Sequence, residues 1–152
     1  MAITQLTAVR RATADWSGDL TSGAGTVSAA SSGVFSDLPI SWAARTEDSG
    51  GKTSPEELLA SAHAACFSMA FSNGLAKAGH PAERLDVTAE VTFEKQDAGW
   101  KVARSHLTVQ GQVPGMSEAD FVTAAEAAKD GCPISVALKG NVELSVEATL
   151  QS

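Results

Sequence analysis

The stretch SPEELLASAHAACFSMAFSNGLAKAG, residues 54–79, decides the fold of this chain. Ser54 can act as an N-cap, Pro55 suits the first helical position, and Glu57 follows the cap by three residues, as in a capping box. Gly79 supplies a stop signal at the other end. We therefore expect one long helix between these signals. Its Ala, Leu, Phe and Met residues occur on more than one face, which indicates a helix buried inside the domain or between subunits.

The residues before this helix are mostly small and polar, and several glycines interrupt them. The segments TVSAASSGVF (26–35) and LPISWAAR (38–45) have the composition of strands, which predicts an N-terminal β-meander. A loop rich in glycine and charge, residues 46–54, then leads into the long helix.

The residues after the helix alternate between apolar and other side chains with a period of two. This pattern over residues 85–95 and 100–113, with a turn between them, predicts a β-hairpin. Ser117 is a candidate N-cap and Gly131 a candidate stop for a second helix. A final strand is expected over residues 141–150. The expected fold class is therefore α+β, with a single domain over residues 1–152.

The two cysteines of the chain, Cys66 and Cys132, occupy different local settings. Cys66 lies in the apolar helix, where its thiol pKa would rise unless a cation is near. Cys132 precedes Pro133, which can begin a new helix, so its sulfur would face free backbone N–H groups that stabilise a thiolate. The pair could be a nucleophile and a resolving thiol, and two inert buried cysteines remain an alternative.

The composition and the sequence motifs argue against several classes of function. The net charge is −7, which argues against binding to nucleic acid or to an anionic membrane surface. No secretory signal and no membrane-spanning run is visible, so a cytoplasmic protein is expected. His63 shares a helix face with Cys66, but two ligands are too few for a metal site. Hydrolase and nucleotide-binding motifs are absent from the sequence, and we expect no cofactor.

Five segments resemble the OsmC/Ohr family of osmotically inducible and organic-hydroperoxide-resistance proteins, and specifically its OsmC branch. They are ADWSGDL, GTVSAASSGVFSDLPISWAAR, SPEELLASAHAACFSMAFS, the VPG before the second helix, and GCPISVAL. The resemblance as a whole extends over nearly the whole length of the chain. The resemblance implies an OsmC-like fold, in which the long helix is central and two chains form an intertwined homodimer. It also implies a role in the response to oxidative and osmotic stress.

The resemblance further implies a thiol-dependent peroxidase that reduces organic hydroperoxides to alcohols. The family's attacking cysteine falls on Cys66 and its resolving cysteine on Cys132, although helix ends alone favour Cys132 as the nucleophile. The family's arginine falls on Arg45 and its glutamate on Glu56, which would form an ion pair that stabilises the Cys66 thiolate. A dithiol, such as a lipoylated protein, is the expected reductant. The alternatives are a stress protein that binds a lipid-like or aromatic molecule without turnover, and a structural dimer.

Overall fold

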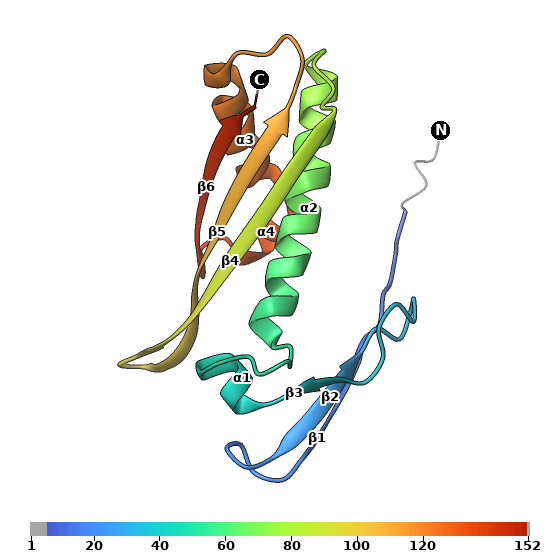
Figure 1. The fold of residues 1–152 in the computed structure, drawn as a ribbon, viewed down its shortest axis with the longest axis vertical. Coiled ribbons are helices and arrows are strands. Elements are labelled where there is room, and N and C mark those ends of the chain that lie inside the picture. Colours follow the sequence, from blue (N-terminus) through green and yellow to red (C-terminus); the bar gives the residue numbers. More distant parts are fainter. Residues whose placement is uncertain (1–5, 152) are drawn as a thin grey trace. The chain divides into compact units, whose positions relative to one another are not determined.

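The computed structural model describes residues 6–151 of the chain, which form two compact units joined between Ser54 and Pro55 (Figure 1). The first unit contains β1 (Thr13–Ser17), β2 (Ala24–Ser28), β3 (Leu38–Ile40) and α1 (Trp42–Thr46). The second contains α2 (Pro55–Lys77), β4 (Arg84–Gln96), β5 (Gly99–Gln112), α3 (Glu118–Gly131), α4 (Pro133–Leu138) and β6 (Glu143–Leu150). Residues 1–5 and 152 of the expected single domain lie outside the described residues, and the single domain stays a prediction.

The first unit is the expected β-meander, with shorter strands than the sequence predicts. Its three strands are antiparallel and follow the order β1-β2-β3. The strand predicted over residues 26–35 ends at Ser28, because the chain then turns back on itself. There the Gly33 N–H donates to the Ala29 carbonyl at 2.8 Å, and the Ala29 N–H donates to the Phe35 carbonyl at 3.0 Å. The first strand, β1, is not among those the sequence predicts.

Arg45 lies in a helix, which corrects its expected place at the end of a strand. The predicted strand over residues 38–45 ends at Ile40, and α1 follows directly. The Ser41 hydroxyl accepts a hydrogen bond from the Ala44 N–H at 3.1 Å and so caps α1. Such a local bond offers the backbone an alternative to strand pairing. Within α1, the Arg45 guanidinium lies 5.4 Å from the centre of the Trp42 ring, in cation–π contact.

The second unit is built on a three-stranded sheet of order β4-β5-β6 (Figure 1). The predicted hairpin is confirmed, with β4 antiparallel to β5 from Arg84 opposite Gln112 to Gln96 opposite Gly99. The predicted last strand, β6, is parallel to β5. A parallel pair needs a crossover connection, and α3 with α4 supplies it.

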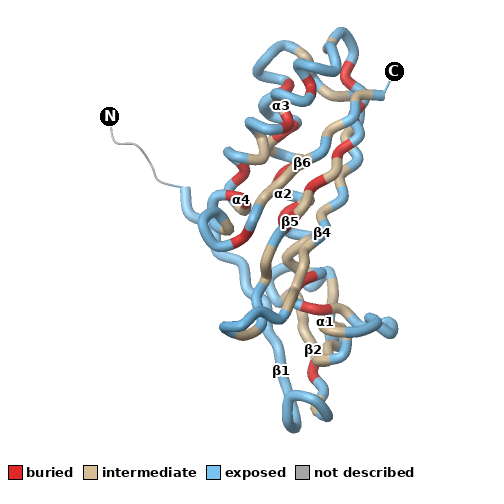
Figure 2. The backbone as a smooth tube through the Cα atoms, turned by 90° about the vertical axis from the view of Figure 1, so that its left-hand side faces the viewer, coloured by how far each residue is buried: buried red, intermediate tan, exposed pale blue. Residues whose placement is uncertain are grey.

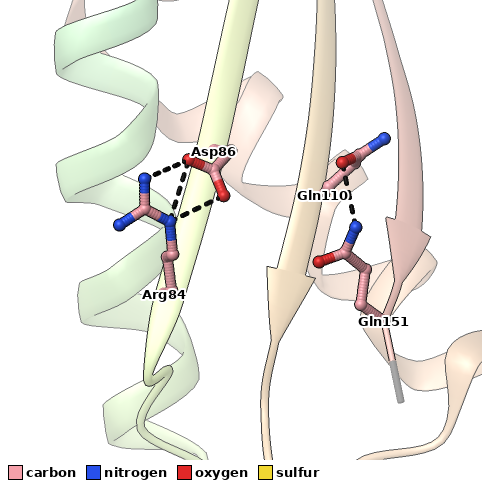
Figure 3. A network of polar contacts seen from close by, with 4 residues as sticks. All are labelled: Arg84, Asp86, Gln110 and Gln151. Atoms are coloured by element: carbon pink, nitrogen blue, oxygen red, sulfur yellow. Dashed lines mark hydrogen bonds and ion pairs between the residues drawn. The ribbon is translucent and has the colours of Figure 1, made fainter.

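Side-chain contacts continue the strand pairing at one end of this sheet (Figure 3). The Gln151 side chain donates to that of Gln110 at 3.0 Å, and the Gln151 N–H donates to the Gly111 carbonyl at 2.8 Å. On β4, the Arg84 guanidinium pairs with the Asp86 carboxylate at 2.7 Å. Both partners of this ion pair are exposed, so it adds little to stability.

The core of the second unit lies between the sheet and one face of α2 (Figure 2). Among the described residues, His63, Phe67, Phe71 and Leu75 recur at every fourth position of α2 and are fully buried. The Phe71 ring lies 5.0 Å from the Phe121 ring of α3. Other faces of α2 are open within one chain, and Met69 is 68% exposed. The burial that the sequence predicts on more than one face is therefore found on one face in the single chain.

The predicted helix signals agree with the helix ends that the structure shows. At the end of α2, Gly79 has a φ of +86°, its N–H bonds the Ala76 carbonyl, and the His80 N–H bonds the Leu75 carbonyl. This is a Schellman motif, which favours glycine at the left-handed position. Ser117 caps α3 by accepting from the Asp120 N–H at 3.1 Å. A further short helix, α4, begins at Pro133, as the Cys-Pro sequence indicates.

Candidate active site around two cysteines

The structure brings Cys66 and Cys132 together, although 132 − 66 = 66 residues separate them in the sequence. Cys66 is at the middle of α2, and Cys132 is between α3 and α4, two helices that both pack against α2. Both thiols are free, and they are close enough for Cys132 to raise the pKa of Cys66. Cys132 is fully buried, whereas Cys66 is partly exposed. The pair thus consists of one thiol that solvent can reach and a neighbouring thiol that it cannot reach.

The break between α3 and α4 places Cys132. The Cys132 N–H donates to the Ala128 carbonyl at 2.8 Å and ends α3, while its carbonyl accepts from the Val136 N–H at 2.9 Å in α4. Its ψ of 126° is not helical, and Pro133 follows as the first residue of α4. Because Cys132 precedes the first turn of α4, its sulfur lies near backbone N–H groups that have no helical partner.

The surroundings of the two sulfurs shift their pKa values in opposite directions. Burial opposes ionisation of Cys132, but the Cys66 thiol, the amide and hydroxyl of Ser135, and the Ile134 amide outweigh it and lower the pKa of Cys132. Burial and the neighbouring Cys132 raise the pKa of Cys66. Within the pair, the surroundings therefore favour a negative charge on Cys132 over one on Cys66. This agrees with the expectation from helix ends, which favours a thiolate at Cys132.

A groove of about 580 Å³ opens beside Cys66, between α2 and α3. Its walls are small or apolar residues: Cys66, Met69, Ala70, Asn73, Gly74, Ala124, Ala127, Ala128, Gly131 and Pro133. Met69 lines the groove, whereas Phe67 and Phe71 of the same helix lie in the core. Each helical position turns by about 100°, so the residue after Cys66 faces the sheet. In the sequence, the groove is indicated by small side chains at every fourth position of the helix, at Cys66, Ala70 and Gly74.

Arg45 and Glu56, the other predicted site residues, belong to different units of the structure. Arg45 is in the last turn of α1, in the first unit. Glu56 is buried in the first turn of α2, in the second unit. It precedes Cys66 by 66 − 56 = 10 residues, which is about 15 Å along a helix axis. The roles predicted for Arg45 and Glu56 toward Cys66 remain predictions.

His63, which shares a helix face with Cys66, lies one helical turn before it on α2. His63 is fully buried, and both of its ring nitrogens bond serine hydroxyls, Nδ1 with Ser105 at 2.6 Å and Nε2 with Ser135 at 2.8 Å. Burial lowers its pKa, so the imidazole is neutral. Among residues 6–151, no three His, Cys, Asp or Glu side chains are grouped to hold a metal ion. None of the described helices is long and apolar enough to span a membrane.

Comparison with known proteins identifies the family. The model of the family "OsmC-like protein" matches residues 47–147. Peroxiredoxin OsmC of Escherichia coli (strain K12) is 40% identical over 142 residues, which are 93% of this chain and 98% of that protein. Organic hydroperoxide resistance protein OhrA of Bacillus subtilis (strain 168) is 32% identical over 97 residues, 62% of this chain and 66% of that protein.

The solved structures agree on the fold. The crystal structure of an organic hydroperoxide resistance protein OsmC from Legionella pneumophila superposes with a TM-score of 0.68 at 23% identity, covering 94% of this chain and 99% of that one. OhrB of Bacillus subtilis superposes with a TM-score of 0.65 at 24% identity, covering 91% and 98%. The expected OsmC-like fold is therefore confirmed, and this chain belongs to the OsmC-like family.

Proposed function

We propose that this chain is a thiol-dependent peroxidase that reduces organic hydroperoxides to alcohols, with Cys66 as the attacking and Cys132 as the resolving residue. The contact between an accessible and a buried thiol carries the proposal. The relatives' names support it: the Escherichia coli relative is a peroxiredoxin, and the Bacillus subtilis relative is an organic hydroperoxide resistance protein. At 40% identity over nearly the whole chain, the first relative is the stronger support for peroxidase chemistry.

Accessibility supports Cys66 as the residue that acts in the first step. The Cys66 side chain lines the groove, and a peroxide in the groove can reach its sulfur. Cys132 has no exposed surface, so a peroxide cannot reach it without movement of the fold. The Cys66 sulfur attacks one peroxide oxygen, the O–O bond breaks, and Cys66 becomes a sulfenic acid. The Cys66 proton passes to the departing alkoxide, which leaves as the alcohol.

The second step uses the lowered pKa of Cys132. Its thiolate attacks the Cys66 sulfur, the S–S bond forms, and the S–O bond of the sulfenic acid breaks. The oxygen leaves as hydroxide, which takes a proton from solvent to become water. The existing contact between the two side chains supports direct resolution within one chain. A dithiol would then reduce the disulfide by exchange and be oxidised itself, and a lipoylated protein is a reductant of this class.

Single-turnover measurements on two variants test these assignments. Cys66→Ser should lose peroxidase activity with cumene hydroperoxide, while Cys132→Ser should still consume one equivalent and stop at a sulfenic acid. Intact-mass detection identifies the product. A sulfenic acid that forms at Cys132 in Cys66→Ser, and not at Cys66 in Cys132→Ser, would reverse the roles. If the wild-type protein with a dithiol consumes no peroxide, the alternative of a small-molecule-binding protein is favoured.

The proposal includes a homodimer whose two sites are each shared between subunits. Glu56 is too far along α2 from Cys66 for one straight helix to bring them into one small site. The open faces of α2, with Met69 68% exposed, are available for a second copy of the chain. An antiparallel pair of central helices would set Glu56 of one chain near Cys66 of the other. Arg45, from either chain, would then stabilise the thiolate together with Glu56.

Mixing inactive subunits tests the shared site. Cys66→Ser and Glu56→Ala chains, each inactive alone, should recover part of the activity after subunit exchange, because one of the two composite sites is then intact. Mass spectrometry of the native mixture verifies that exchange has occurred. Heterodimers that form but stay inactive would contradict the shared site. A fully active monomer by light scattering would contradict the dimer itself.

A further inference from the structure

His63, a buried histidine that the proposed reaction does not use, is hydrogen-bonded to Ser135, which shares the start of α4 with Cys132. The ring bridges the Ser105 hydroxyl of β5 and the Ser135 hydroxyl of α4, at 2.6 and 2.8 Å. All three side chains are buried, with exposed fractions of 0% for His63 and Ser105 and 1% for Ser135. On α2, His63 precedes Cys66 by one helical turn. The network therefore joins three elements directly behind the two sulfurs.

Ser135 connects this network to Cys132. Cys132 is the residue that caps α4, and Ser135 is the third residue of that helix. Side chains at these two positions of a helix start lie next to each other, as in a capping box. The Ser135 hydroxyl is also among the groups that lower the pKa of Cys132. The two hydrogen bonds of His63 and the start of α4 thus place Ser105, His63, Ser135 and Cys132 in one series.

The donors and acceptors of the series fix its direction when Cys132 is ionised. A thiolate can only accept, so the Ser135 hydroxyl donates to the sulfur, and its oxygen is free to accept from His63. A neutral imidazole has one donor and one acceptor, so Nε2–H donates to Ser135 and Nδ1 accepts from the Ser105 hydroxyl. Every polar atom of the series has a partner in this arrangement, in agreement with the lack of unsatisfied buried side-chain atoms among the described residues.

We infer that His63 and Ser135 are positioning residues for the resolving step: His63 holds the Ser135 hydroxyl so that it donates to the sulfur of Cys132. The inference rests on the proposed peroxidase function for its catalytic meaning. The step itself is the condensation described above, in which the S–S bond forms, the S–O bond of the Cys66 sulfenic acid breaks, and water leaves. The network needs no further oxidant or reductant, because it changes only how readily Cys132 presents a thiolate.

A titration without peroxide tests the network separately from the peroxidase reaction. In a Cys66→Ser background, the ultraviolet absorbance of the Cys132 thiolate is followed against pH. Ser135→Ala should raise the midpoint, leaving about tenfold less thiolate at a pH below it, since a hydrogen bond to a charged group is lost. His63→Phe should raise the midpoint as well, because Ser135 loses the hydrogen bond that holds its hydroxyl in place. Ser135→Thr, which keeps the hydroxyl, should restore the wild-type midpoint.

Ser145→Ala is the matched control. The Ser145 hydroxyl makes an equally short bond, 2.6 Å, to a ring nitrogen of His106 on the same sheet. Its loss should leave the Cys132 titration unchanged. If His63→Phe does not fold, Ser105→Ala removes the histidine's other partner and should produce a smaller rise than Ser135→Ala. A Ser135→Ala midpoint equal to that of the Ser145→Ala control would overturn the inference.

The second readout separates failure of the inference from failure of the proposed function. With both cysteines present, one equivalent of peroxide is added, and sulfenic acid and disulfide are followed in time. Ser135→Ala should slow disulfide formation about tenfold and leave sulfenic acid formation unchanged. A wild-type protein that does not react refutes the peroxidase proposal, while the titration still decides the network. If sulfenic acid formation and disulfide formation both become slower, Ser135 acts through the packing of the site, and its role in resolution is contradicted.

Discussion

Gly74 is a position where the groove beside Cys66 can be filled without a steric clash. It lies inside α2 and lines the groove, eight residues after Cys66, or about 12 Å along the helix axis. A Cβ atom added there would meet no heavy atom within 4 Å. Leucine at this position should therefore occupy the part of the groove farther from the sulfur and leave Cys66 accessible.

The expected effect depends on the length of the substrate. If leucine displaces two or three methylenes of a bound alkyl chain, at about 0.8 kcal/mol each, the loss is about 1.6–2.4 kcal/mol. That corresponds to a roughly 15- to 60-fold lower kcat/KM for a long-chain alkyl hydroperoxide. Hydrogen peroxide has no chain to displace, so its kcat/KM should change less than about twofold. Replacing glycine inside a helix should also raise stability by about 0.5–1 kcal/mol.

The assay compares kcat/KM for the two peroxides in the wild-type protein, Gly74→Leu and Gly74→Ala, with urea unfolding of each. Gly74→Ala is the matched control, because it gains the same helix stability and fills little of the groove. The wild-type protein should also prefer the long-chain peroxide to hydrogen peroxide. If folded Gly74→Leu keeps its full kcat/KM for the long-chain substrate, or loses activity equally on both, the groove is not the alkyl site.

Three further predictions concern stability. Burial lowers the pKa of His63 from 6.5, so below about pH 6.5 the unfolded chain binds a proton that the folded chain does not, and the free energy of unfolding falls by up to about 1.4 kcal/mol per pH unit. Urea unfolding of His63→Gln should therefore show a smaller loss of stability between about pH 7.5 and 5.5 than the wild-type protein shows, and equal losses would contradict this. In Gly111→Ala the new Cβ would meet the Phe121 ring at 2.5 Å, so the free energy of unfolding should fall by about 1–3 kcal/mol, and an unchanged Tm would contradict it. In Gly25→Ala the Cβ would overlap the Asp15 carbonyl of the neighbouring strand, so hydrogen exchange in β1 and β2 should accelerate, whereas unchanged protection would show that the strands adjust.

Local signals in the sequence were sufficient for the elements of the second unit. A capping serine, a proline at the first helical position and a left-handed glycine are decided by hydrogen bonds between near neighbours, and the ends of α2 and α3 follow them. Alternation with period two gave the hairpin in the same way. The parallel pairing of β6 with β5 depends on where the crossover helices pack, which no local pattern states.

The first unit shows where local patterns were insufficient. The segment around Arg45 has strand-like composition, yet a helix begins there, and the Ser41 hydroxyl caps it by accepting a hydrogen bond from the Ala44 N–H. The polar strand β1 is exposed along its whole length, so it shows no burial pattern to detect. Its register instead depends on backbone pairing with β2 and on the bond from the Thr26 hydroxyl to the Asp15 carboxylate at 2.8 Å.

The disagreement between the two predictions for the nucleophile has a physical resolution. Ionisation favours Cys132, whose pKa is lowered by its neighbours, while exposure to the groove favours Cys66. A peroxide must reach the attacking sulfur, which is why we propose Cys66 for the first step. The resolving thiol attacks a sulfur that it already contacts, so it needs no access and gains from being ionised. The two settings therefore suit the two successive steps, and a buried network through His63 is useful only behind the cysteine that acts second.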